Sequence, residues 1–327
     1  MTVHSATRPA SAKKQFVFAA DLGGTHLRVA AVDCDGKIYF RQMHPTPRAE
    51  EPNEIVRELA AAVRECEREL AELGGAFSAA SIAVPGTVNV AEGLVVQAPN
   101  VPSLDGFRLR AALQSEFKWP VILENDGNAA AIGEMWRGAG QGYRTIICVT
   151  LGTGVGGGII LDGKLWRGAD GSAGEIGHIG VDPFAGVPCT CGSQGCLEVY
   201  ASATAIVRMT RETVAHYPNS VLHHIEDLTS EKVYRAGKEG DELALEVFRR
   251  MGVYLGIGLA SLINLLNPEV IVVGGGLANG WELFEKHMQQ KIIERAFPIP
   301  VRSVKIVRAQ CGDDAGLLGA ARLAFED

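Results

Sequence analysis

The sequence predicts an α/β protein made of two related domains. Strand-like apolar runs alternate with helical patterns along the chain, which is typical of mixed α/β layers. A strand, a glycine–threonine turn, a second strand and a DGK turn occur twice, within residues 17–38 and 147–165. This internal repeat indicates two domains of similar build that face one another, although any two glycine-turn hairpins look alike. A length of 327 residues also exceeds what one compact core usually holds.

The first half of the chain alternates strands and helices. Residues 16–33 predict two strands joined by a glycine turn, and the periodic apolar residues of 53–70 predict a helix. Residues 80–86 predict a strand that ends at a Pro-Gly pair. Residues 121–126 predict another strand, which leads directly into a helix over 127–136.

The second half repeats this order. Residues 144–166 predict a further pair of strands around a glycine turn, and residues 241–266 predict a long helix that ends at an Asn-Pro pair. Residues 269–276 predict a buried strand that runs into three glycines. Residues 313–325 predict a closing helix.

Charge and hydropathy exclude several classes of protein. The net charge of −7 argues against a nucleic-acid partner, and no apolar run reaches the roughly 18 residues that a membrane span needs. Residues 1–15 are polar and lack the apolar core of a secretory signal, so we expect them to be disordered. We therefore expect a cytoplasmic protein without a membrane partner.

Glycines gather where strands end, which indicates loops whose backbone approaches a ligand closely. In DLGGT, the turn of Gly23, Gly24 and Thr25 can offer backbone N–H groups to phosphate oxygens. Asp21, at the end of the strand, can hold Mg²⁺ directly or through water. A tight hairpin with an aspartate cap is the alternative. The loops LGTG and GGG, over 151–154 and 274–276, could meet the same ligand.

Asp126 stands at the junction of a predicted strand and a predicted helix. A carboxylate there is held firmly and can accept a proton from a sugar hydroxyl, as a general base must. Asn125, beside it, could hold a neighbouring hydroxyl. The alternative is that Asp126 is only the N-cap of the following helix.

One histidine and three cysteines have the composition of a tetrahedral zinc site: His178, Cys189, Cys191 and Cys196. A redox pair is disfavoured because C-x-x-C is absent, and a reducing cytosol disfavours a disulfide. We expect a closed structural site without an open position for water. The remaining cysteines are expected to be buried free thiols: Cys34, Cys66, Cys148 and Cys311.

Five motifs occur together and in order: DLGGT, ENDGNAAA, LGTGVGGG, GEIGHIGVDPFAGVPCTCGSQGCLE and VVGGG. In this the chain resembles the ROK family (repressors, open reading frames and sugar kinases), and its bacterial glucokinases most of all. The resemblance implies a two-domain actin-like/hexokinase-like (ribonuclease H-like) ATPase fold with an interdomain active-site cleft. We expect a small domain of residues 16–124 plus 313–327 and a large domain of 125–312 that carries the zinc loop.

The resemblance also implies the chemistry. ATP would phosphorylate D-glucose at the 6-hydroxyl, with Asp126 as the base, Mg²⁺ at the phosphates and a structural Zn²⁺. The residues implied to contact the sugar are Asn100, Asn125, Asp126, Glu175, His178 and Glu198. The residues implied to contact ATP are Asp21, Gly23, Gly24, Thr25, Gly152, Thr153, Gly154, Gly275 and Gly276. His178 would have two tasks, with one ring nitrogen on zinc and the other toward the sugar.

Several alternatives stay open. The sugar could be fructose, mannose, allose, N-acetylglucosamine or N-acetylmannosamine, and the donor could be polyphosphate or ADP. A sugar-sensing repressor of the same family would need a helix-turn-helix domain, and only about 15 residues precede the first strand. An actin-like or chaperone-like ATPase is disfavoured by Glu175 and Glu198 beside the zinc loop. The resemblance suggests a homodimer, with a tetramer as the alternative.

Overall fold

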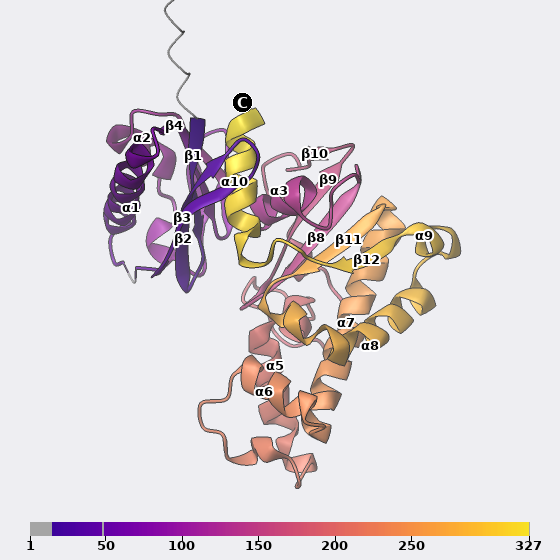
Figure 1. The fold of residues 1–327 in the computed structure, drawn as a ribbon. Helices are drawn as coiled ribbons and strands as arrows, with labels where there is room; N and C mark the ends of the chain where they lie inside the picture. The colour runs from indigo at the N-terminus through magenta and orange to yellow at the C-terminus, as the bar shows by residue number, and fades with distance from the viewer. Residues whose placement is uncertain (1–14, 48, 327) are drawn as a thin grey trace, which may run out of the picture.

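Two five-stranded sheets of the same strand order form the framework of the chain (Figure 1). The computed structural model describes residues 15–47 and 49–326. The first sheet has the order β3-β2-β1-β4-β7, formed by β1 (Gln15–Leu22), β2 (His26–Asp33), β3 (Ile38–Pro45), β4 (Ala76–Val84) and β7 (Val121–Asn125). The second has the order β10-β9-β8-β11-β12, formed by β8 (Ile146–Leu151), β9 (Val155–Leu161), β10 (Lys164–Leu165), β11 (Val270–Gly274) and β12 (Lys305–Arg308). A short ribbon pairs β5 (Thr87–Asn89) with β6 (Leu94–Gln97).

The two sheets correspond strand by strand. In each, the first three strands are antiparallel neighbours, as β1 is to β2 and β8 is to β9. The fourth strand then lies parallel to the first, and the fifth parallel to the fourth. The predicted repeat therefore reflects a true correspondence between the hairpins β1–β2 and β8–β9.

Each sheet is buried on both faces by helices. On the first sheet, alternate residues of β1 point to opposite sides: Phe16 and Phe18 pack with α1 (Pro52–Glu72), and Val17 packs with α10 (Ala315–Glu326). On the second sheet, Ile147 packs toward α7 (Glu242–Leu266), and Ile146 packs toward α3 (Asp126–Arg137). Strands covered on both faces need near-continuous apolar runs, as the sequence has.

The remaining helices are peripheral to the two sheets. The α-helices among them are α2 (Leu109–Glu116), α4 (Glu198–Ala201), α5 (Ala203–Thr213), α6 (Ser230–Lys238), α8 (Trp281–Arg295) and α9 (Pro298–Ser303). Short 3₁₀ turns occur at η1 (Pro102–Leu104), η2 (Ile176–His178), η3 (Val214–His216), η4 (Val221–His224), η5 (Gly276–Gly280) and η6 (Gly312–Asp314). Helix α7 ends where Asn267 adopts a left-handed conformation, at the predicted Asn-Pro pair.

Helices α3 and α10 are exchanged between the sheets. Helix α3 continues from the first sheet but packs on β8 and β9 of the second, whereas α10 continues from the second sheet and packs on β1 and β4 of the first. The two helices lie side by side between the sheets (Figure 1). The packing of α10 on β1 supports our proposal that residues 313–327 belong with the small domain.

The α3–α10 contact is made by backbone against backbone. A Cβ added at Gly319 would lie 1.7 Å from the carbonyl oxygen of Ala129, and one added at Gly133 would lie 2.1 Å from that of Ala315. No side chain fits at such distances, so each helix needs a glycine at the crossing. Each helix thus presents two small residues four positions apart, and these pairs allow the two halves of the chain to approach closely: Ala129 and Gly133 in α3, and Ala315 and Gly319 in α10.

The prediction that Cys34 is buried is wrong, because the turn after β2 exposes it, and Cys311 is only partly buried. The expected disorder of residues 1–15 falls outside the described residues except at Gln15, which begins β1. Within the ranges that the structure describes, no helix has the length and apolar character that crossing a bilayer requires.

We predict that Gly319→Ala lowers the free energy of unfolding in urea by about 2 kcal/mol or more, because a methyl group cannot enter this helix crossing. The control is Gly237→Ala in α6, where the added Cβ would lie 2.9 Å from the flexible end of Leu283 and at an ordinary contact distance of 3.5 Å from the Ala244 Cβ. That variant should stay within about 1 kcal/mol of the wild type. Equal effects of both substitutions would contradict a tight crossing.

Candidate functional site

A cavity of about 220 Å³ lies where the two halves meet. Its walls come from the ends of β1, β8 and β11, from the start of α3 and from the start of α10. It is lined by charged groups and by backbone, among them Asp21, Arg28, Asp126, Thr150, Gly275 and Asp313. The structure therefore brings together predicted residues that are far apart in the sequence, namely Asp21, Asp126, Gly275 and Gly276.

Asp126 is the first residue of α3 and not its N-cap. The cap is Asn125, whose side-chain oxygen accepts a hydrogen bond from the N–H of Asn128 at 2.9 Å. The Asp126 carboxylate accepts from the N–H of Gly127 at 2.8 Å and from Asn125 Nδ2 at 3.1 Å. The alternative of a simple helix cap is thus wrong, and this carboxylate is held at the cavity wall by its own helix turn.

Burial raises the pKa of two of the aspartates that line the cavity, Asp126 and Asp21. The pKa of Asp126 is raised to about 7, mainly by burial and in part by the nearby carboxylates of Asp21 and, more weakly, Glu175. Burial also raises the pKa of Asp21 to about 6, although the Arg28 guanidinium at 3.6 Å opposes this rise. A carboxyl that titrates near neutral pH at a cavity wall is suited to accept a proton.

Two residues from other parts of the sequence contact the first of the two glycine hairpin loops. In the first, Gly24 lies against Asn100, since an added Cβ would be 2.8 Å from the Asn100 Cβ. Thr46 fixes the same loop by donating its hydroxyl to the carbonyl of Gly23. Asn100 is thus brought to the loop from a distant part of the sequence, and Thr46 is a contact that the sequence did not suggest.

Gly275 brings the third glycine segment to the second hairpin. Its φ of +84° and a hypothetical Cβ only 2.4 Å from the Leu151 carbonyl oxygen both require glycine. Residues 274–276 therefore lie beside the start of the 152–154 loop.

Some glycines of LGTGVGGG serve packing. Gly157 and Gly158 lie in β9, and the start of α3 presses directly on them. A Cβ added at Gly127 would lie 2.5 Å from the Gly157 carbonyl oxygen. These glycines let α3 approach the sheet closely, and in doing so they fix the position of Asp126.

An ion pair between a buried glutamate and a partly exposed arginine, which the sequence analysis missed, supports the same corner. The side chain of Glu124 is 2% exposed, and its Oε2 accepts from Arg167 Nη2 at 2.7 Å and Nε at 2.8 Å. Its Oε1 accepts from the Asn125 N–H at 3.1 Å and from Asn128 Nδ2 at 3.0 Å. Arg167 precedes the segment that leads to Glu175, so this pair ties that segment to the start of α3. In the sequence, the only indication of this ion pair was an acidic residue, Glu124, within the predicted strand of residues 121–126.

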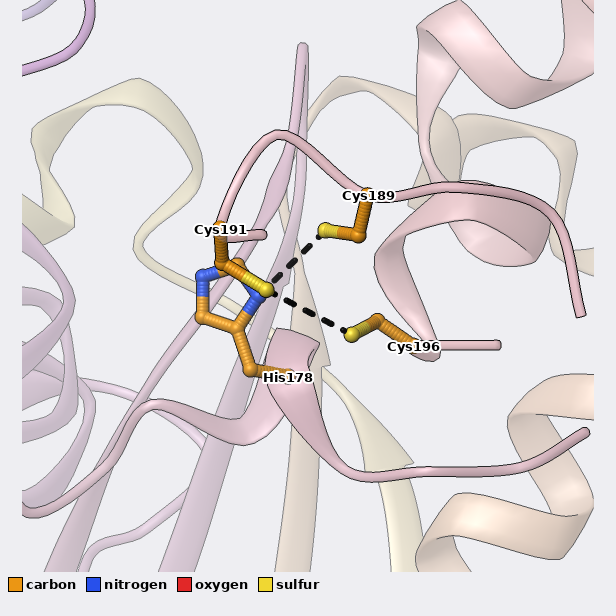
Figure 2. Close-up of side chains that lie close together, drawn as sticks. All are labelled: His178, Cys189, Cys191 and Cys196. Carbon is orange, nitrogen blue, oxygen red and sulfur yellow. Dashed lines mark hydrogen bonds between the residues drawn. The ribbon is translucent and has the colours of Figure 1, made fainter. Parts of the chain in front are cut away.

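His178, Cys189, Cys191 and Cys196 form one cluster. Their ligand atoms all lie within 4.8 Å of one another, and Figure 2 shows the imidazole and the sulfurs converging. Cys191 Sγ lies 3.7 Å from Cys196 Sγ, and Cys189 Sγ lies 3.7 Å from His178 Nδ1. Tetrahedral zinc with Zn–S bonds of about 2.3 Å would separate sulfur ligands by about 3.8 Å, so the cluster fits this metal.

The two acids that flank the cluster, Glu175 and Glu198, make different contacts. The His178 Nε2 atom, on the ring edge away from the thiols, lies 3.9 Å from Glu175 Oε2. Glu175 is half-exposed and close enough to raise the pKa of Asp126. Glu198 Oε2, in contrast, accepts a hydrogen bond from the Val155 N–H at 2.9 Å. At least one oxygen of Glu198 is therefore engaged by the second hairpin loop.

Comparison with known proteins agrees with this architecture. Residues 17–327 match the ROK family. The glucokinase of Halalkalibacterium halodurans is 38% identical over 313 residues, covering 93% of each chain. A ROK family glucokinase from Streptomyces griseus, solved with glucose and AMPPNP, superposes with a TM-score of 0.83 at 35% identity, covering 95% of this chain and 100% of that one. The xylose repressor of Caldicellulosiruptor bescii is 29% identical, covering 95% of this chain and 78% of the repressor.

Proposed function

Because this chain belongs to the ROK family and has its actin-like/hexokinase-like kinase fold, we propose that it is a glucokinase, which uses ATP to phosphorylate D-glucose at the 6-hydroxyl. Similarity to glucokinases at 34–38% identity over nearly the whole chain supports the enzyme class. The observation that carries the proposal is the Asp126 carboxylate, which has a pKa of about 7 and lies in the same cavity as the glycines of residues 274–276.

The proposed reaction is a direct transfer. The 6-oxygen of the sugar attacks the γ-phosphorus of ATP, the bond from that phosphorus to the β–γ bridging oxygen breaks, and ADP leaves. The hydroxyl proton passes to the Asp126 carboxylate. Such a transfer depends mainly on positioning and charge neutralisation, which a firmly held carboxylate and backbone N–H groups can supply.

The proposed sugar site has Asp126 at its centre. Asn100, Asn125, Glu175, His178 and Glu198 would complete it. The Asn125 amide nitrogen already donates to the Gly86 carbonyl at 2.8 Å and to Asp126 at 3.1 Å. Its remaining contribution is therefore an acceptor lone pair on the oxygen, together with the orientation that it gives to Asp126. Polar groups of fixed direction discriminate between sugar epimers, because a wrong epimer leaves them unpaired.

The proposed donor site follows the glycine segments. Gly23, Gly24, Thr25, Gly152, Thr153 and Gly154 would contact the phosphates, and Gly275 and Gly276 would contact adenosine. Asp21 faces the cavity with oxygen ligands of the kind that Mg²⁺ prefers, so the site fits this ion. When bound, Mg²⁺ would neutralise phosphate charge.

We assign the cluster of His178 and the three cysteines to structural zinc, because thiolate and imidazole ligands suit zinc and not magnesium or calcium. Four protein ligands leave no position for a water molecule, so the metal would fix the loop and leave the reaction to Asp126. Dimerisation, or assembly into a tetramer, stays a prediction.

A sugar panel with ATP and Mg²⁺ tests the substrate assignment. We expect glucose to give the highest kcat/KM, with sugar 6-phosphate and ADP formed in equal amounts. A much higher kcat/KM for another hexose would overturn the choice of glucose. Because the relatives include repressors, the assay must measure turnover and not binding alone; sugar binding without any phosphorylation would overturn the enzyme assignment.

We predict that Asp126→Asn lowers kcat by about a hundredfold or more, with glucose binding in calorimetry largely kept. In the wild type, kcat/KM should fall as pH decreases through about 7, because a protonated Asp126 cannot accept the hydroxyl proton. The control is Asp227→Asn, because Asp227 is exposed and its ion pair with Lys232 contributes little to stability. A kcat of Asp126→Asn close to that of the wild type would show that Asp126 is not the base.

We predict that Cys191→Ser removes most of the zinc measured by metal analysis and weakens glucose binding by about tenfold, because the loop also aims His178. Cys34→Ser, at an exposed cysteine outside the cluster, is the control and should keep its zinc. Freshly purified wild-type protein without zinc would contradict the assignment.

A further inference from the structure

The segment of residues 198–204 is bonded along the whole of the loop of residues 152–155. We call these the clamp segment and the donor loop. Glu198 Oε2 accepts from the Val155 N–H at 2.9 Å, the Ala203 N–H donates to the Gly152 carbonyl at 2.8 Å, and Thr204 Oγ1 donates to the Thr153 carbonyl at 2.9 Å. A Cβ added at Gly154 would lie 2.3 Å from Glu198 Oε2, so this carboxylate rests directly on the loop.

The clamp segment is itself anchored firmly. It begins two residues after the cluster residue Cys196, and the N–H of the intervening Leu197 donates to the Ile179 carbonyl at 2.9 Å, next to His178. Leu197 is fully buried, and Tyr200 stacks on Tyr254 with 3.9 Å between the ring centroids. The segment therefore joins the metal cluster and the core of the second half to the donor loop.

The donor loop is the turn of the β8–β9 hairpin, which the strand pair Leu151–Val155 closes. Gly152 and Gly154 lack side chains, and glycine loses more conformational entropy than any other residue when it becomes ordered. Within the loop, the Gly152 N–H donates to the Gly154 carbonyl at 2.9 Å. The three bonds from the clamp segment are thus well placed to hold the loop in one conformation before a ligand arrives.

We propose that the clamp segment preorganises the donor loop for the phosphates of ATP, with Glu198 and Thr204 as positioning residues. The metal cluster would then set the geometry of the donor site as well as that of the sugar site. Glu198 would join the two sites, with one carboxylate oxygen on the Val155 N–H and the other turned to the sugar. This inference rests on the proposed function, since it takes the donor loop as a phosphate-binding loop.

Thr204→Val removes one clamp bond, together with the contact of Thr204 Oγ1 with Ser202 Oγ at 2.8 Å, and leaves the metal ligands and the proposed sugar contacts in place. Thr213→Val is the matched control, because Thr213 lies in the same helix and its hydroxyl donates to the Met209 carbonyl at 2.7 Å. The Kd of AMPPNP is measured by calorimetry on zinc-loaded protein with Mg²⁺ and without sugar. The KM values for ATP and glucose and the zinc content are measured beside it.

Thr204→Val should raise the Kd of AMPPNP and the KM for ATP roughly three- to tenfold, the usual effect of one hydrogen bond. Its KM for glucose and its zinc content should stay at the wild-type values, and Thr213→Val should match the wild type throughout. AMPPNP binding that is equal in the two variants would overturn the clamp alone. A wild-type protein that neither binds AMPPNP nor uses ATP would overturn the proposed function and the clamp with it.

Discussion

The backbone contact between α3 and α10 is the constraint on which the rest of the structure depends. Each helix continues from one sheet and covers the other, and Gly133 and Gly319 let them cross without side chains between them. Because α3 begins at the last strand of the first sheet and packs on the second, its first residue, Asp126, lies between the two sheets. The position of the proposed base relative to the ends of β8 and β11 is therefore set by helix packing.

The site combines groups whose burial opposes folding with groups that hold them in place. The raised pKa values of Asp21 and Asp126 mean that ionising either carboxyl in the folded chain is unfavourable. In the unfolded chain both aspartates lose their protons near pH 4, whereas in the folded chain they keep them until about pH 6 and 7. The free energy of unfolding therefore decreases as the pH rises through this range. Buried apolar cores on both faces of each sheet stabilise the fold against that loss.

Much of this could be predicted from local sequence patterns, and the rest could not. The repeat of 17–38 in 147–165 predicted two domains of similar build, and the density of one histidine and three cysteines within residues 178–196 predicted a cluster that the structure assembles. The patterns did not distinguish glycines that let a ligand approach the backbone from glycines that let a helix pack closely on a strand, such as Gly157. They also missed the Glu124–Arg167 ion pair, because its partners meet only through the packing of the second sheet on α3.

The central claim is that Asp126, held by α3 between the sheets, receives the proton of the sugar hydroxyl that ATP phosphorylates. A crystal structure of the chain with glucose and AMPPNP tests it most directly. We expect the glucose 6-hydroxyl within hydrogen-bond distance of the Asp126 carboxylate, with the γ-phosphate beyond it toward Asp21 and Thr150. A bound glucose whose 6-hydroxyl meets another group, with Asp126 still bonded only to Asn125 and Gly127, would contradict it.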